Sequence, residues 1–415
     1  MKKIIKCLGI ILIIFGFLAN PFIIEYFLIP DKKLSFLLFY IVIIFLDCLL
    51  IFLGLILFKK SDKVIQSKRL IINLLLVFFV IITLVFSIEM ISFIVLKSSK
   101  NFSPETISND CNGLEQNKDR GYVFKKNYVC NHIMSLDNGS IIFNVNLTTD
   151  PQGRRIVYSK YSKNKPHLLF FGCSITFGYG LEDNETLPYM ISKSLPGYNI
   201  YNYAVSGYGP QHMLALLENG HLSKEVESKN GIAIYVFITS HVDRAIGSSF
   251  CDWIYTSPYY FLDGNGKLQR DGSFITGRGI ITSVYILFST LKSKSSFLRL
   301  INLNLPPRFS KKDVLLTYEI IARSKSLYEE QFNGTFYVLI HPYHLDTPQN
   351  KKVLNILTNL FEKNNITALD YSSMIPDLEG YRIPIDGHPN VELNRLVSDR
   401  LIEDLNFSKD PKLEL

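Results

Sequence analysis

Hydrophobic residues are concentrated at the amino end of the chain. Three apolar runs cover about residues 4–28, 34–58 and 70–96, and each exceeds the roughly 20 residues that a helix needs to cross a bilayer. Asn20-Pro21 interrupts the first run, so its helix is expected to end or kink there. This run also has features of a signal peptide, but it is long, lacks a clear cleavage site and precedes two further runs. We therefore predict three transmembrane helices.

Basic residues in the short loops predict how these helices are oriented. The amino end and the connection 59–69 carry more Lys and Arg than the connection 29–33 or the exit after residue 96. The richer sides belong in the cytoplasm. We expect an integral protein of the cytoplasmic (inner) membrane, with its amino terminus in the cytoplasm and everything after residue 100 on the extracytoplasmic, periplasmic side.

Two acidic residues, Asp47 and Glu89, fall inside the predicted spans. They either mark a polar pathway or face neighbouring helices. We favour the second interpretation because no Lys, Arg or His lies deep in a span to pair with them.

Two cysteines, Cys111 and Cys130, lie just after the predicted membrane region. An oxidising compartment would permit a disulfide between them. Spacing alone does not show whether their geometry suits a bridge, so the sequence leaves that question open.

The chain beyond the spans has an ordinary globular composition, and the formal net charge of all 415 residues is +7. It contains neither tandem basic-aromatic clusters nor a Gly-rich phosphate loop. A nucleic-acid partner is therefore not expected.

The apolar pattern changes again in the second half of the chain. Residues 101–165 are polar and irregular, and from residue 166 short apolar runs alternate with helical stretches. That alternation is typical of β-α-β units and a parallel sheet. We predict an α/β domain over 166–415, with an aromatic-rich insertion at about 248–312. The expected strands are His167–Phe171, Tyr198–Tyr203, Ile232–Ile238, Thr335–Ile340 and Thr367–Asp370.

Residues at the carboxyl ends of these strands carry the candidate chemistry, because ligands bind at that edge of an open parallel sheet. After the first strand, Gly172 allows a sharp turn and Ser174 stands at the start of a helix. Backbone N–H groups there point towards a developing negative oxygen. A serine in this place also serves as a simple helix cap.

A base and an acid follow the last strand. The segment from Pro384 to Asn390 contains Asp386-Gly387-His388 in a turn-forming context. A serine hydroxyl needs a base near neutral pH, and the base needs an orienting partner. His388 supplies the first and Asp386 the second.

Two further strand ends supply candidate oxyanion donors. Gly207, in the segment Asn202–Gln211, offers an unobstructed N–H, although its glycines also suit a plain turn. Thr239-Ser240-His241 follows the third strand, where a side-chain donor is needed.

The blocks Phe171–Gly178, Asn202–Gln211 and Asp386–Asn390 together resemble the SGNH (GDSL-like) hydrolase family in order and spacing. The run Gln152–Arg155 is similar to the lead-in of its membrane-attached bacterial members. The resemblance implies a three-layer α/β/α, flavodoxin-like fold. It also implies that Ser174 is both the nucleophile and an oxyanion donor.

The same resemblance implies that Gly207 is the second oxyanion donor, His388 the base and Asp386 its support. Two positions depart from the family pattern. His241 stands where an asparagine usually donates, and only Gly387 separates the acid from the base, where two residues are usual. Loss of one oxyanion donor typically costs about 100- to 1000-fold in rate, so the role of His241 matters.

Other reactive side chains near this edge are given simpler interpretations. Cys173, beside Ser174, is expected to be buried against the sheet. His341 and His344 follow the fourth strand, but no carboxylate or cysteine cluster of suitable spacing accompanies them. We predict no metal and no cofactor.

Three hypotheses of function follow. The first is a membrane-anchored, extracytoplasmic serine esterase that removes an acyl group, such as acetate, from a cell-surface glycan or lipid. The second is an O-acyltransferase that uses the same Ser174, His388 and Asp386 with a membrane-protein partner. The third is a catalytically weakened SGNH fold that acts as a binding or assembly subunit.

Overall fold

The structure, a computed structural model, describes residues 2–18, scattered positions between 44 and 59, and 69–98, 106–109, 111, 113–343 and 347–405. The chain forms two compact units. The N-terminal unit comprises Met1–Phe102 and Leu287–Arg308, and the sheet unit comprises Ser103–Ile286 and Phe309–Leu415.

Long apolar helices make up the described part of the N-terminal unit. Helix α1 spans Lys2–Leu18 and helix α5 spans Arg69–Ser98. Among the described residues, one helix is long and apolar enough to cross a membrane, the Phe79–Lys97 part of α5 with a mean hydropathy of 2.6. The spans expected over 4–28 and 34–58 both extend into residues outside the described ranges.

The acidic residue of α5 has a specific partner inside this unit. Glu89 accepts hydrogen bonds from the Ser295 hydroxyl and, at 2.7 Å, from the Ser296 backbone N–H. These groups lie at the start of helix α13, Ser296–Leu300. Glu89 therefore caps a short helix of the insertion, which the sequence did not reveal because the two segments are about 200 residues apart.

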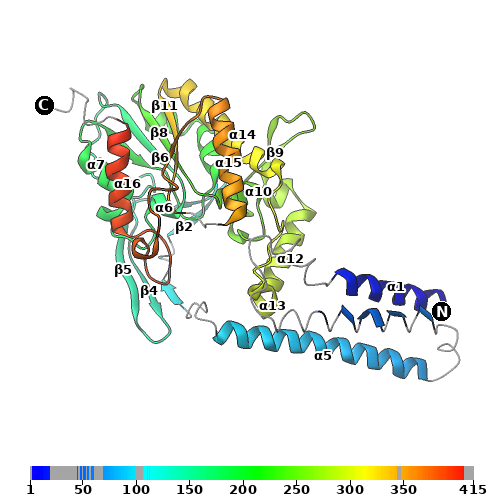
Figure 1. Cartoon of the computed structure of the whole chain (residues 1–415). Coiled ribbons are helices and arrows are strands. Elements are labelled where there is room, and N and C mark those ends of the chain that lie inside the picture. Colours follow the sequence, from blue (N-terminus) through cyan, green and yellow to red (C-terminus); the bar gives the residue numbers. More distant parts are fainter. Residues whose placement is uncertain are drawn as a thin grey trace. The chain divides into compact units, whose positions relative to one another are not determined.

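A five-stranded parallel sheet forms the centre of the sheet unit (Figure 1). Its strand order is β12-β11-β8-β6-β7, which is the 2-1-3-4-5 order of flavodoxin-like folds when the strands are numbered along the chain. All four neighbouring pairs are parallel. The predicted α/β architecture and its five strands are confirmed. Their bounds are β6 His167–Phe171, β7 Asn199–Asn202, β8 Ile232–Phe237, β11 Thr335–Ile340 and β12 Thr367–Asp370.

Helices cover both faces of this sheet because its strands carry apolar side chains in both directions. On one face, Leu169 and Phe237 pack with residues of α8, α14 and α15. On the other face, Phe170 and Val236 pack with residues of α7 and α16. The result is three layers, visible in Figure 1 as helices on either side of the strands. The bounds are α7 Leu187–Ser194, α8 Pro210–Glu218, α14 Lys311–Phe332, α15 Pro348–Lys363 and α16 Val391–Asp404.

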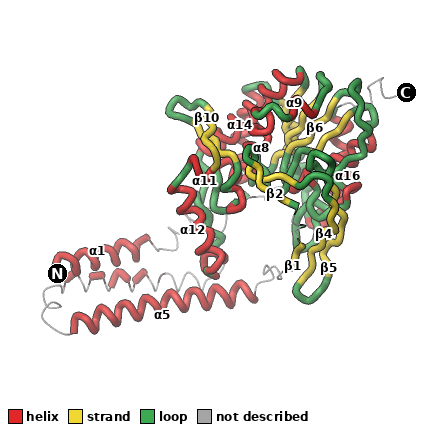
Figure 2. Tube along the Cα trace, turned by 180° about the vertical axis from the view of Figure 1, so that it is seen from behind, coloured by secondary structure: helices red, strands yellow, loops and turns green. Residues whose placement is uncertain are grey.

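The segment before the central sheet is not irregular, as the sequence suggested, but forms two small antiparallel sheets. One has the strand order β1-β4-β5 and the other pairs β2 with β3. Figure 2 shows β1, β4 and β5 side by side. Cys111 and Cys130 are joined by a disulfide. The bounds are β1 Thr106–Asn109, β2 Leu114–Asn117, β3 Gly121–Phe124, β4 Val129–Leu136 and β5 Ile141–Thr148.

The predicted insertion contains a β-hairpin and several helices. Strands β9, Pro258–Leu262, and β10, Leu268–Ser273, pair antiparallel. Helices α11, Phe274–Gly277, and α12, Ile280–Lys294, follow, and α12 continues from the sheet unit into the N-terminal unit. Three short helices remain in the described part of the sheet unit: α6, Ser174–Phe177, α9, Leu222–Glu225, and α10, His241–Ile246.

Candidate active site

Ser174 lies directly beyond β6, at the first residue of the short helix α6, Ser174–Phe177. Gly172 precedes it where a side chain would not fit, because an added Cβ would stand 2.2 Å from the Thr176 hydroxyl. The helix ends at Gly178, in the left-handed conformation at φ 87°. Ser174 retains 9% of its surface exposed. Its hydroxyl is thus placed at the carboxyl edge of the sheet, as expected from the sequence.

His388 reaches this hydroxyl from the far end of the chain. Its Nε2 lies 2.9 Å from Ser174 Oγ, and its Nδ1 lies 2.8 Å from Asp386 Oδ1. The structure therefore brings the three predicted residues into one hydrogen-bonded chain. If Nδ1 carries the proton and donates to Asp386, Nε2 is free to accept the Ser174 proton.

The one-residue spacing between acid and base is accommodated by a tight turn. Gly387 adopts φ 86°, a conformation that suits glycine. The Gly387 N–H donates to the Ile383 carbonyl at 2.8 Å, and the His388 N–H donates to Asp386 Oδ1 at 3.1 Å. One carboxylate oxygen thus binds both the backbone and the ring of the base.

Gly207 lies between two aromatic side chains of other segments. Trp253 Nε1 donates to the Gly207 carbonyl at 3.2 Å, and the Tyr122 hydroxyl donates to the Ser206 carbonyl at 3.0 Å. Gly207 itself adopts φ 83°. These bonds occupy carbonyls, and within the described part of the chain no acceptor is recorded for the Gly207 N–H. That N–H has the chemistry of an oxyanion donor.

His241 follows the third strand, as the sequence predicted. It is fully buried at the start of helix α10, His241–Ile246, and packs against the rings of Tyr235 and Phe237. The Tyr235 hydroxyl lies 2.7 Å from its Nδ1. Burial lowers the pKa of His241, so the ring is neutral. No contact between His241 and Ser174 is recorded among the described residues, and its oxyanion role stays a prediction.

Cys173 agrees with its simpler interpretation as a buried side chain. Cys173 is 1% exposed and packs with Ile175 and Ile238. His341 is buried, and its Nδ1 accepts the Tyr343 N–H at 3.0 Å. His344 lies outside the described residues. No group of three or more metal-ligating side chains occurs in the part of the chain that the structure describes.

Two buried arginines near the site were not assigned roles from the sequence. Arg155 donates to carbonyls that follow Ser174, including that of Phe177 at 3.3 Å. Arg244 donates to the Tyr208 carbonyl at 2.7 Å. Neither contact has a local sequence signal, because each depends on segments that meet only in the folded chain.

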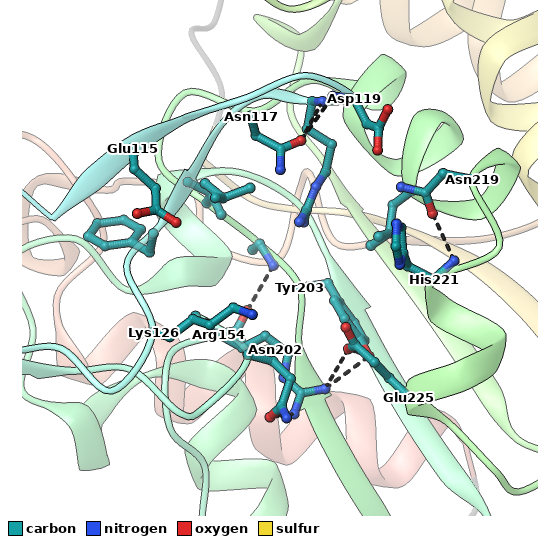
Figure 3. A pocket seen from close by; sticks show the side chains of 18 residues that line it. Glu115, Asn117, Asp119, Lys126, Arg154, Asn202, Tyr203, Asn219, His221 and Glu225 are labelled. Atoms are coloured by element: carbon teal, nitrogen blue, oxygen red, sulfur yellow. Dashed lines mark hydrogen bonds and ion pairs between the residues drawn. The ribbon is translucent and has the colours of Figure 1, made fainter.

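A cavity of about 330 Å³ borders the loop that carries Gly207 (Figure 3). Tyr203 and Glu225 lie on one side of it, where the Tyr203 hydroxyl donates to Glu225 Oε2 at 2.9 Å. Arg154, also in its wall, pairs with Glu225 at 3.2 Å. Acidic and basic side chains both line this cavity, and Ser174 is not among its lining residues.

Comparisons with known proteins find solved structures that are similar at low identity and low TM-score. No family model and no curated protein matches the sequence. A lipolytic G-D-S-L family protein of Veillonella parvula is similar at 16% identity, over 57% of this chain and 96% of that chain, with a TM-score of 0.34. The psychrotrophic esterase EstA of a Pseudoalteromonas species has 13% identity, over 58% and 97% of the chains, with a TM-score of 0.33.

A GDSL-like lipase of Bacteroides thetaiotaomicron has 11% identity, over 60% and 91% of the chains, with a TM-score of 0.34. Likeness at this level does not establish what this chain binds or does.

Proposed function

We propose that this chain is a serine ester hydrolase of the SGNH type, with Ser174 as nucleophile, His388 as general base and Asp386 as its support. The observation that carries the proposal is the continuous chain of contacts at 2.9 Å and 2.8 Å from Ser174 through His388 to Asp386. A helix cap would not need a histidine from more than 200 residues away. The arrangement supplies what a weak hydroxyl nucleophile requires.

The reaction then proceeds in two halves. His388 Nε2 takes the Ser174 proton while Oγ attacks the ester carbonyl carbon, and the carbonyl oxygen becomes an oxyanion. The backbone N–H groups of Ser174 and Gly207 stabilise that oxyanion. The intermediate collapses to an acyl-serine, and the leaving alkoxide receives the proton from His388 and departs as an alcohol.

Water resolves the acyl-serine in the second half. His388 takes a proton from the water as its oxygen attacks the acyl carbon, and the acid is released with Ser174 restored. Another alcohol in place of water would give acyl transfer, so the same three residues also serve the acyltransferase alternative.

We place the substrate outside the cell, on an acylated glycan or lipid. The apolar part of α5 supports a membrane anchor. The disulfide between Cys111 and Cys130 suits an oxidising, extracytoplasmic compartment. The three-helix anchor with a cytoplasmic amino terminus and a possible membrane-protein partner remain parts of this proposal.

The test is hydrolysis of p-nitrophenyl acetate by the full-length protein in detergent, beside Ser174→Ala and Asp386→Asn variants. We expect Ser174→Ala to be inactive and Asp386→Asn to lose about four orders of magnitude in kcat. Equal rates in the wild type and Ser174→Ala would contradict the proposal. Acyl transfer to an added oligosaccharide in preference to water would identify the transferase instead.

A further inference from the structure

Arg244 is a buried guanidinium without a carboxylate partner. The residue is 7% exposed, and none of the ion pairs recorded among the described residues includes it. Its Nη1 donates to the Tyr208 carbonyl at 2.7 Å, and its charge interacts electrostatically with the nearby thiols of Cys173 and Cys251. Its Nε is buried with no partner. Such a group is costly to bury, and a fold retains it where the charge has a use.

No carboxylate is paired with Arg244 in the part of the chain that the structure describes. The nearest titratable rings, His241 and His212, have pKa values lowered by burial, so both are neutral. Burial also raises the pKa of Cys251 above its ordinary value, so this thiol keeps its proton. The positive charge of Arg244 is therefore available to a negative charge that forms nearby.

The groups that interact with Arg244 are next to both oxyanion donors along the chain. Cys173 directly precedes Ser174, and Tyr208 directly follows Gly207. Cys251 belongs to the segment that carries Trp253, which in turn holds the Gly207 carbonyl. Arg244 thus binds the Gly207 loop and lies near groups of the nucleophile loop and of the insertion.

We propose that Arg244 is a positioning residue of the hydrolase site, which fixes the backbone N–H groups of Ser174 and Gly207 and adds positive charge behind the oxyanion that they bind. This inference rests on the proposed ester hydrolysis. It predicts a loss in kcat with little change in KM, because the charge acts when the oxyanion forms.

The experiment compares Arg244→Met and Arg244→Lys in the full-length protein, with Arg278→Met as the matched control. Arg278 also donates to carbonyls without an ion pair among the described residues, at Ile246 and Gly247. Competent active sites are counted with a fluorophosphonate, from which Ser174 Oγ displaces fluoride. Rates per competent site then exclude misfolded protein.

We expect Arg244→Met to lower kcat per site about 10- to 100-fold with KM within about twofold, somewhat less than the loss of a direct donor. Arg244→Lys should recover part of that loss, and Arg278→Met should keep the wild-type rate per site. An unchanged kcat per site in Arg244→Met, or equal losses in the Met and Lys variants, would overturn the inference while the proposed function stands. A wild type without Ser174-dependent activity would overturn both.

An independent observation concerns helix α12, which exposes a row of large apolar side chains. Ile280 is 83% exposed, Val284 49%, Leu287 60% and Leu291 53%. Steps of four, three and four residues bring them onto one side of a helix. An exposed apolar row of this length is typical of a helix that lies in a membrane surface.

The end of α12 is tied to the apolar helix α5 within the N-terminal unit. Ser295 and Ser296, which follow the last residue of α12, bind Glu89 of α5. Lys292 and Lys294 stand in the last turn of α12. Glu89 lies within the Phe79–Lys97 part of α5, so if that part crosses the bilayer, this end of α12 lies against the membrane.

We infer that α12 rests in the surface of the lipid bilayer with the row from Ile280 to Leu291 among the acyl chains. The test uses full-length protein carrying Trp253→Phe, reconstituted into vesicles of phosphatidylcholine and phosphatidylglycerol with brominated acyl chains. One tryptophan is then placed at Phe79 in α5, at Leu287 in the row, or at Ser293, which is exposed on the opposite side of α12.

We expect the probes at 79 and 287 to be quenched at least about twofold more than the probe at 293, because the row would be buried roughly 5–10 Å into the membrane surface. Quenching at 79 with equal, weak quenching at 287 and 293 would overturn the inference alone. A probe at 79 that is not quenched would overturn both this inference and the membrane anchor.

Discussion

The two loops that meet at the site are each braced by a buried arginine, but the two arginines differ in charge balance. On the nucleophile side, Arg155 is 2% exposed and pairs with Asp183 at 3.0 Å. It also donates to the carbonyls of Phe177, Gly178 and Leu181, which follow Ser174. On the Gly207 side, Arg244 is buried to a similar degree without a carboxylate. The two arginines are therefore buried to a similar degree, but only Arg155 has a carboxylate that balances its charge.

Arg155 therefore acts as a structural clamp, whereas the charge of Arg244 is not balanced by a carboxylate. A paired and fully bonded guanidinium stabilises the fold and contributes little net field, because its partner cancels it. An unpaired one contributes less to stability and more to the potential at the site. Substitutions on the Arg155 side should thus reduce stability, whereas those on the Gly207 side should reduce rate.

The largest expected effect is that of Arg155→Met on folding. Removing the guanidinium leaves the Asp183 carboxylate and several carbonyls without their donor, which should lower the free energy of unfolding by about 3–5 kcal/mol. Chemical unfolding of the detergent-solubilised protein measures this. Arg395→Met, which breaks an exposed pair with Glu392, should leave the free energy of unfolding nearly unchanged. If Arg155→Met lowered the free energy of unfolding no more than this control does, Arg155 would contribute no more to stability than an exposed ion pair.

Gly207→Ala should show the next largest effect, which is on the rate of ester hydrolysis and not on stability. An added Cβ would stand 2.5 Å from the Tyr122 hydroxyl and 2.6 Å from Trp253 Nε1, so the loop must move and its N–H with it. We expect kcat/KM to fall about 100- to 1000-fold, as for the loss of one oxyanion donor. Gly220→Ala is the matched control, because Gly220 also has a positive φ, 68°, but no atom within 4 Å of the added Cβ. Similar rates in both variants would exclude Gly207 as a donor.

Asp183→Asn tests the clamp more gently. The amide keeps the shape and one acceptor but removes the negative charge, while Arg155 retains its carbonyl partners. We expect a loss of about 2 kcal/mol in the free energy of unfolding, within the range of a charged hydrogen bond. The rate per competent site should change little. A loss as large as that of Arg155→Met would show that the ion pair, and not the carbonyl contacts, carries the clamp.

The smallest effect is a pH dependence of stability on the Gly207 side. The Gly209 N–H donates to His212 Nδ1 at 3.0 Å, and burial lowers the pKa of His212 from 6.5 to about 3. Below pH 6.5 the unfolded chain gains a proton that the folded chain refuses, so stability falls between pH 6.5 and about 3. The slope from this residue is at most about 1.4 kcal/mol per pH unit. Comparison of the wild type with His212→Gln by unfolding at several pH values should show a shallower slope in the variant; equal slopes would contradict this assignment.

The sequence predicted the sheet well because each strand carries a local signal. The runs at His167–Phe171 and Thr335–Ile340 coincide with β6 and β11. The sequence did not predict the two small sheets of the lead-in segment, because strands such as β2, Leu114–Asn117, are short and polar. The cap that Glu89 provides was missed because it depends on a contact between distant segments.

At the site too, positions with a local sequence signal were predicted, and contacts between distant segments were missed. Ser174, His388 and Asp386 follow strands, and the parallel sheet brings strand ends together whatever the rest of the chain does. His241 also follows a strand, but its side chain turns into the core beside Tyr235. Arg244 stands on the same short helix and has no motif around it, since the Tyr208 carbonyl that it binds comes from another segment. Strand-end position predicts proximity to the site and does not predict where a side chain points.

The turn Asp386-Gly387-His388 has a consequence for the evolution of the site. Its acid and base are encoded by nearly adjacent codons and are held by one carboxylate oxygen and one glycine conformation. A short insertion or deletion in this stretch would remove both functions together, while recombination anywhere else in the gene would carry them as a single heritable block. A lineage that abandoned the proposed hydrolysis should therefore lose this turn as a unit, and a lineage that kept it should preserve the length of the turn more strictly than the residues around it.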